Sequence, residues 1–104
     1  MPLPHLTDEQ RAAALEKAAQ ARRARAEIKN RLKYGQGSLA EVVREGQSDD
    51  VVGKMRVSAL LESMPGVGRV TARRIMEEVG ISEQRRVRGL GAHQVSALLA
   101  RFEG

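Results

Sequence analysis

The segment Val57–Met76 reads VSALLESMPGVGRVTARRIM, and it decides the fold. Each half carries apolar residues at helical spacing, and the tetrapeptide Pro-Gly-Val-Gly separates the halves. Pro65 favours a helix end just before it, because proline disfavours helical backbone angles in the preceding residue. Gly66 and Gly68 permit unusual backbone angles and leave room for a ligand to approach the main chain. We therefore predict two short helices joined by a tight hairpin.

The second helix of this hairpin begins among arginines. The amides of Gly68, Arg69 and Val70 are expected at a helix N-terminus, where free N–H donors and the helix dipole favour an anion. Val67 is expected to point back between the helices, and the small side chain of Ala72 to let them pack closely. A turn that binds nothing is the alternative, and the surrounding arginines argue against it. The predicted phosphate contacts are Gly66, Val67, Gly68, Arg69, Thr71 and Arg73.

A second basic cluster, EQRRVRGLG over residues 83–91, follows in the connection after this helix. Three arginines within four residues repel one another unless a counter-charge lies between them. A solvated loop is the simpler interpretation. We favour a lid beside the hairpin that grips a neighbouring phosphate or enters the minor groove. The predicted lid contacts are Arg85, Arg86, Arg88 and Gly89.

The N-terminal third of the chain predicts one long helix. Thr7 to Gln10 form a capping box, and the helix can run to about Tyr34, where Gly35 follows. Its apolar side consists mostly of alanines, so we expect the N-terminal half to pack lightly and to extend from the body. A basic stripe beside it is either a solvated face or a second nucleic-acid surface, for which the candidates are Arg22, Arg25, Lys29 and Lys33.

Capping residues and glycines place the remaining helices. Ser38 opens one that ends at Gly46, Asp49 caps the next, and the last runs from Ala92 to about Phe102. In the helix after the hairpin, the residues expected in the core are Val70, Ile75, Met76 and Val79.

No segment alternates convincingly as a strand. The predicted fold class is therefore all-α, with a long basic N-terminal helix over residues 1–36 and a compact bundle of short helices over residues 37–104. The hairpin lies in the second part, which is the predicted nucleic-acid-binding domain.

Charge points to a nucleic-acid partner. The 104 residues include 18 Lys plus Arg against 13 Asp plus Glu, a net charge of +5. Fourteen of the 18 cations are arginine, whose planar fork suits bidentate contact with phosphate. Two basic blocks, residues 11–44 and 65–101, flank a mildly acidic middle, which suggests two contact surfaces. Tyr and Phe occur once each and Trp is absent, so a duplex is favoured over single strands that stack on aromatic rings.

Catalysis finds little support in the sequence. A lyase-type glycosylase needs a lysine near the hairpin, but the last lysine, Lys54, precedes it. Glu77, Glu78 and Glu83 are the carboxylates available for hydrolysis, yet few aromatic residues exist to line a pocket for a flipped base. Asp49 with its neighbouring aspartate is interpreted as a helix cap, and the two histidines, residues 5 and 93, as surface residues.

We therefore expect no enzymatic activity, no metal, no cofactor and no small-molecule substrate. The absence of cysteine, of an N-terminal signal region and of an apolar run of about 20 residues favours a cytoplasmic protein with no membrane association. The expected state is a monomer.

Several segments together resemble known families. Pro65 to Gly68, with Leu60, Ala72 and Ile75 in register, resemble the helix-hairpin-helix motif, although Met64 stands where leucine is commoner. Residues 3–19 (LPxLTDEQRAAALEKAA, with position 5 unmatched), with further matches over 21–27, 52–55, 57–62 and 85–91 (RRVRGLG), are similar to the actinobacterial integration host factor family along essentially the whole chain.

That resemblance implies a helix-two-turns-helix domain similar to part of a small-subunit ribosomal protein. It also implies a nucleoid-associated protein that binds double-stranded DNA with little sequence preference and changes its shape and topology. The hairpin and the basic lid would make the contacts. A ribosomal-type protein that binds structured RNA is the main alternative. A module that binds acidic proteins is a third, and the hairpin argues against it because its free amides are placed for phosphate.

Overall fold

A computed structural model of the chain describes residues 6–103. The interpretation of His5 and of the N-terminus as free of a signal region lies outside those residues. The helices are α1 (Asp8–Lys33), α2 (Leu39–Glu45), α3 (Asp50–Gly53), α4 (Val57–Ser63), α5 (Arg69–Val79), the 3-10 helix η1 (Val87–Gly89) and α6 (Ala92–Glu103). The described residues contain no β-strand, only one isolated antiparallel bridge, so the predicted all-α class is confirmed.

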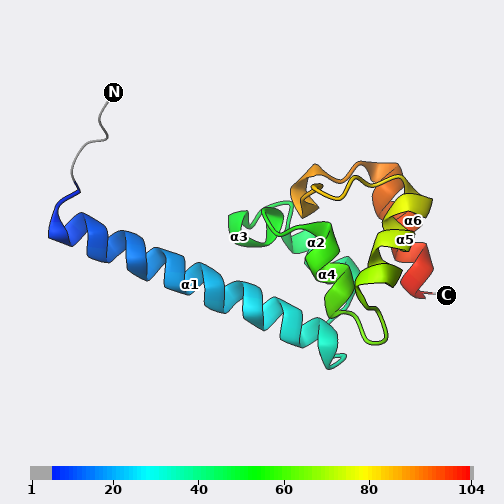
Figure 1. The fold of residues 1–104 in the computed structure, drawn as a ribbon, viewed down its shortest axis with the longest axis horizontal. Helices are drawn as coiled ribbons and strands as arrows, with labels where there is room; N and C mark the ends of the chain where they lie inside the picture. The colour runs from blue at the N-terminus through cyan, green and yellow to red at the C-terminus, as the bar shows by residue number, and fades with distance from the viewer. Residues whose placement is uncertain (1–5, 104) are drawn as a thin grey trace.

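The long helix α1 reaches well beyond the rest of the fold (Figure 1). Its 26 residues span about 39 Å at 1.5 Å per residue, in a molecule of 52 × 32 × 25 Å. The predicted capping box is present, with Thr7 and Gln10 each accepting a backbone amide of the other at 3.0 Å. Only Ile28 and Leu32 of α1 are buried, whereas Leu15 is 65% exposed. The expectation that the N-terminal half packs lightly is confirmed.

The compact part gathers the short helices around one apolar core. Leu60 and Leu61 of α4 lie at its centre, and the end of α1 packs against it through Leu32. The side chains with almost no exposed surface are Leu32, Leu60, Leu61, Met76, Leu98, Val42, Val57 and Val87. No described helix has the length and apolarity needed to cross a membrane. α4 and α5 are thus held as a rigid pair, and the hairpin between them has a fixed geometry.

Two expectations about individual residues are wrong. Val70 is not a core residue, because it is 72% exposed in the first turn of α5. Gly68 does not have an unusual backbone conformation: its φ of −92° and ψ of −176° are extended angles that any residue adopts. Of the two hairpin glycines, only Gly66, with φ of +76°, occupies the left-handed region that favours glycine. The turn therefore needs one glycine for its backbone, not two.

Candidate nucleic-acid interface

The hairpin presents the N-terminus of α5 to solvent. α4 ends at Ser63, the amide of Val67 donates to the carbonyl of Met64 at 3.1 Å, and Gly68 caps α5 without any side-chain hydrogen bond. The first helical bond of α5 is donated by Ala72 to the carbonyl of Gly68 at 2.9 Å. The amides before Ala72 in this first turn consequently have no helical acceptor. Their dipoles sum to a partial positive charge at this point.

The surface above these amides is open. A Cβ atom placed on Gly66 or on Gly68 would meet no protein atom within 4 Å. Since Gly68 has ordinary backbone angles as well, nothing within the fold requires it to lack a side chain. The missing side chain instead lets an external group approach the main chain closely. Val67 is partly buried against the core and Ala72 is buried, as the sequence predicted.

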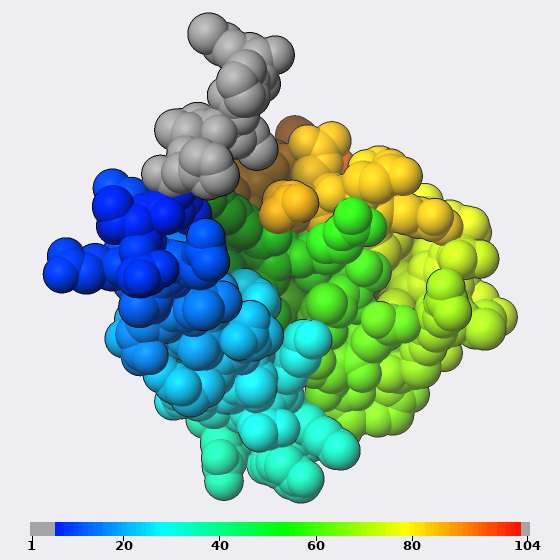
Figure 2. Space-filling model, turned by 60° about the vertical axis from the view of Figure 1, so that its left-hand side comes forward, coloured from blue at the N-terminus to red at the C-terminus, as the bar shows by residue number. Residues whose placement is uncertain are grey.

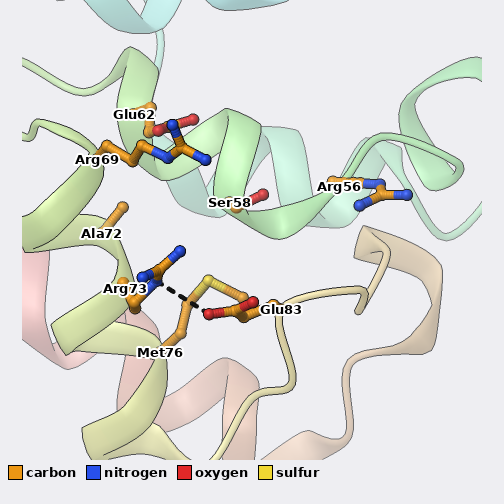
Figure 3. A pocket seen from close by; sticks show the side chains of 8 residues that line it. All are labelled: Arg56, Ser58, Glu62, Arg69, Ala72, Arg73, Met76 and Glu83. Atoms are coloured by element: carbon orange, nitrogen blue, oxygen red, sulfur yellow. Dashed lines mark ion pairs between the residues drawn. The ribbon is translucent and has the colours of Figure 1, made fainter.

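A polar pocket of about 400 Å³ lies beside the hairpin, between α4 and α5 (Figure 3). Arg69 and Arg73 extend into it from α5, and Glu62 and Glu83 balance part of their charge. Arg73 forms an ion pair with Glu83, with Nε and Oε1 2.9 Å apart. Both side chains are more than half exposed, so the pair contributes at most about 1 kcal/mol and a phosphate can compete with it.

The predicted lid is attached to the body through its backbone. The amide of Val57 donates to the carbonyl of Arg85 at 3.0 Å, and the amide of Val87 donates to the carbonyl of Met55 at 2.9 Å. Val87 is fully buried and packs where Gly46 has no side chain, since a Cβ there would lie 2.5 Å from its Cγ1. Sequence reasoning treated this stretch as an open loop because a two-residue bridge has no periodic signal. The lid is a fixed ridge on the surface.

The three lid arginines make three different contacts. The guanidinium of Arg85 donates to the carbonyl of Gly89 at 2.9 Å, and that of Arg86 donates to the carbonyl of Lys54 at 3.0 Å. Arg88 forms an ion pair with Asp50 of α3, and this hydrogen-bonded guanidinium lowers the pKa of the Asp50 carboxyl. Asp50 supplies a counter-charge to one of the three lid arginines, and the other two donate to neutral carbonyls.

The lid and the hairpin lie at opposite ends of α4. Arg86 of the lid bridges to Arg56, just before α4, whereas the hairpin begins after Ser63. Seven residues of α-helix separate the two by about 10 Å, and Figure 1 shows the lid and the hairpin on opposite edges of the α4–α5 pair. The expected position of the lid beside the hairpin is therefore corrected.

A second concavity, of about 540 Å³, lies where α1 faces α3, α4 and the lid (Figure 2). The long helix contributes Lys17, Arg25 and Lys29 to its lining, and the facing elements contribute Lys54, Arg56 and Arg86. We call this six-cation concavity the basic groove.

Two of the four stripe residues proposed from the sequence, Arg25 and Lys29, line the basic groove, whereas Arg22 and Lys33 lie exposed outside it. Lys17 was not predicted from the sequence. Its four-residue spacing to positions 21, 25 and 29 indicates that it lies on the same face of the helix. The cations facing α1 come from separate elements, and only the tertiary fold brings them to the groove.

The fold and this site define a helix-two-turns-helix protein, and the comparison with known families agrees. Residues 32–102 match the S13-like H2TH domain. The chain is 67% identical over 102 residues to the integration host factor of Streptomyces coelicolor, covering 98% of this chain and 95% of that protein. It is 62% identical to the integration host factor of Mycobacterium tuberculosis over 98% of this chain and 97% of the relative.

A solved structure described as sIHF bound to an 8bp palindromic DNA superposes with a TM-score of 0.81 at 64% identity. The match covers 86% of this chain and 99% of that one. The chain belongs to the integration host factor family, which confirms the resemblance found in its sequence.

Proposed function

We propose that this protein is a nucleoid-associated factor that binds double-stranded DNA largely without regard to sequence and bends or bridges it, altering its topology. The main observation behind this proposal is the geometry of the hairpin. Its glycine turn leaves the N-terminus of α5 open, and Arg69 and Arg73 lie beside it. The DNA-bound relative, at 64% identity, supports the choice of ligand. Such a protein acts on DNA in the cytoplasm.

In this proposal the hairpin amides of Gly68, Arg69 and Val70 hold one phosphate, and Arg69 neutralises its neighbour. Backbone amides carry no information about base identity, which accounts for weak sequence preference. The lid contributes further cations, of which Arg85, Arg86 and Arg88 are exposed enough to reach phosphate. About 5–8 phosphate contacts would give a log–log dependence of affinity on salt with a slope of about −5 to −7.

We assign the hairpin and lid to a DNA-binding domain over residues 37–104, with residues 1–36 as a basic arm. The arm shares the core through Ile28 and Leu32, which fixes its direction relative to the hairpin. Arg22 and Lys33 lie exposed on α1 and are available to a second DNA segment. A rigid arm that binds DNA at a second place would bend one duplex or bridge two.

Binding alone, without catalysis, is the proposed mode of action. Glu83, one of the two carboxylates in the pocket beside the hairpin, is paired with Arg73. The described residues contain no group of three His, Cys, Asp or Glu side chains arranged for a metal ion. A monomer suffices, because one chain carries both proposed surfaces.

Structured RNA is the second candidate ligand, and the match to an S13-like domain is the observation that favours it. The same hairpin amides would hold an RNA phosphate equally well. The two candidates differ in helix geometry, since A-form RNA has a deep, narrow major groove and a shallow minor groove. Affinity for matched duplexes therefore separates them.

The test is binding to a random-sequence DNA duplex and to an RNA duplex of equal length, each across a salt series. Gly68→Glu and the triple change Arg85→Ala, Arg86→Ala and Arg88→Ala are measured alongside, after circular dichroism shows that they fold. Salt-steep binding that prefers DNA and weakens in both variants is expected. Binding that neither change affects would move the contact to α1, and a preference for RNA would favour the ribosomal-type function.

A further inference from the structure

The basic groove gathers more unbalanced positive charge than the polar pocket beside the hairpin. Six cations line it, and Asp50 is the only acidic residue among the lining. Asp50 is already paired with Arg88, and none of the six cations forms an ion pair within residues 6–103. Like charges on α1 and on the facing elements thus oppose each other across the groove. A ligand that carries several negative charges would relieve this repulsion.

The floor of the groove is apolar. Ala21 of α1, Val51 of α3 and Ala59 of α4 are partly exposed and, with the buried Met55, complete its lining. Phosphate groups alone would use the cations and leave this floor in contact with water. A ligand that also carries a flat ring system would cover the floor, because burial of apolar surface favours binding. The lining therefore favours a ligand that carries both anionic groups and a ring.

The size of the groove also limits its occupant. Its volume of about 540 Å³ lies within the range of about 300–1,000 Å³ typical of small-molecule sites. Arg25 and Arg56 supply planar forks suited to consecutive phosphates, and Lys17, Lys29 and Lys54 supply point charges. Arg86 lines the groove as well, but its guanidinium already donates to the carbonyl of Lys54, and it stays assigned to the lid.

From these observations we infer that the basic groove binds a nucleoside polyphosphate, with the phosphates on its cations and the base against the apolar floor. The ligand is bound and released unchanged. This site is distinct from the hairpin, whose amides lie beyond the other end of α4. Occupancy would neutralise Arg25 and Lys29 on the arm while leaving the hairpin amides free.

The primary measurement is the thermal melting temperature of the full chain with ATP, inorganic tripolyphosphate or adenosine, without added Mg²⁺. A ligand at about ten times its Kd raises the melting temperature of a domain this size by about 6–11 °C. We expect a shift with ATP, a smaller one with tripolyphosphate and none with adenosine. No shift with ATP would overturn the inference. Equal shifts with ATP and tripolyphosphate would do the same, because the floor would then bind no base.

Variants locate the site. The double change Lys17→Gln and Lys54→Gln removes two groove cations that have no assigned role in DNA binding, and we expect ATP affinity measured by calorimetry to fall by about tenfold or more. Arg22→Gln is the matched control, because it removes one cation of α1 that does not line the groove. Unchanged ATP affinity in the double variant would overturn the assignment, as would an equal loss in the control.

A competition experiment distinguishes binding of a free nucleotide in the groove from binding of the DNA backbone there. Saturating duplex is added to the ATP complex at about 150 mM salt, where charges more than about 8 Å apart are screened. ATP affinity within about threefold of its DNA-free value is expected if the groove is separate. Displacement of ATP by the duplex would instead assign the groove to nucleic-acid backbone and overturn the proposal.

Discussion

Replacing Gly68 by aspartate separates the role of the hairpin in folding from its role in binding. Gly68 is the N-cap of α5, has extended backbone angles, and has free space where a side chain would lie. An aspartate fits there and can accept from the free amides of the first turn. Its cap and its charge near the helix dipole should raise the free energy of unfolding by about 0.5–1 kcal/mol.

The same carboxylate should abolish the phosphate site. It occupies the amides and places a negative charge close to the incoming phosphate. At about 5 Å and an effective dielectric constant near 20, this repulsion costs about 3 kcal/mol. We expect DNA affinity to fall by roughly 30- to 900-fold, for a total cost of about 2–4 kcal/mol. The log–log salt slope should become shallower by about 0.9 for the lost phosphate contact.

Gly68→Asn is the matched control, since it has nearly the same shape and capping ability without the charge. Fluorescence anisotropy with a labelled random-sequence duplex measures affinity, and thermal melting measures stability. We expect the Gly68→Asp variant to be at least as stable as the native chain. We expect its affinity for DNA to be much lower than that of the Gly68→Asn variant. If both variants fold and bind DNA as tightly as the native chain, the hairpin does not hold phosphate. If both variants lose DNA affinity equally, the effect is a steric one, and electrostatic repulsion plays no part.

Leu61→Ala removes a fully buried side chain of α4, and thermal melting should show a loss of about 2–5 kcal/mol in unfolding free energy. Gly53→Ala would place a Cβ 2.6 Å from the carbonyl oxygen of Gly46 and 3.0 Å from Nε of Arg88, so the same measurement should show a loss of about 1–3 kcal/mol. Asp50→Asn frees Arg88 and should tighten DNA binding. Because Arg88 lowers the pKa of Asp50, the stability that this carboxyl adds is present above its unfolded pKa and lost as the pH falls through its folded pKa.

Each of these three outcomes can be contradicted. Leu15→Ala, at a 65% exposed position of α1, is the control for the core change and should alter stability by less than about 0.5 kcal/mol. Native stability in the Gly53 variant would show that the main chain there moves freely enough to admit a methyl group. Unaltered DNA affinity after Asp50→Asn would remove Arg88 from the contact surface. A stability difference from Asp50→Asn that is the same at all pH values would show that this ion pair does not act in folding.

Helix boundaries were predictable because local signals set them. α4 ends before Pro65 and α5 begins after Gly68, so the Pro-Gly-Val-Gly stretch separates two short helices as predicted. Thr7, Ser38 and Asp49 cap their helices as predicted, each accepting a backbone amide within the first turn. Such contacts span two or three residues, so they can be recognised without knowledge of the tertiary fold.

Placement of side chains across elements was less predictable. Val70 has the spacing of a core residue, but the hairpin turns that part of α5 to solvent. The bridge from Arg86 to Arg56 and the pairing of Arg88 with Asp50 join residues 30 and 38 positions apart, with no pattern in the sequence to mark them. The predicted DNA contacts remain predictions. The structure changes their grouping, with the hairpin at one end of α4 and the lid at the other.

The uneven burial of α1 divides a single continuous helix between two levels of protection against hydrogen exchange. Amides near Ile28 and Leu32 can open only when the core opens, so they should exchange with deuterium as slowly as those of α4. Amides near Leu15 lie on a stretch with no buried side chain, and fraying from the N-terminal end exposes them without disturbing the core. The free energy of opening should therefore rise steeply along α1 towards the body. A ligand that binds the outer half of α1 would slow hydrogen exchange there first. Exchange rates along α1 therefore indicate whether a ligand contacts the arm.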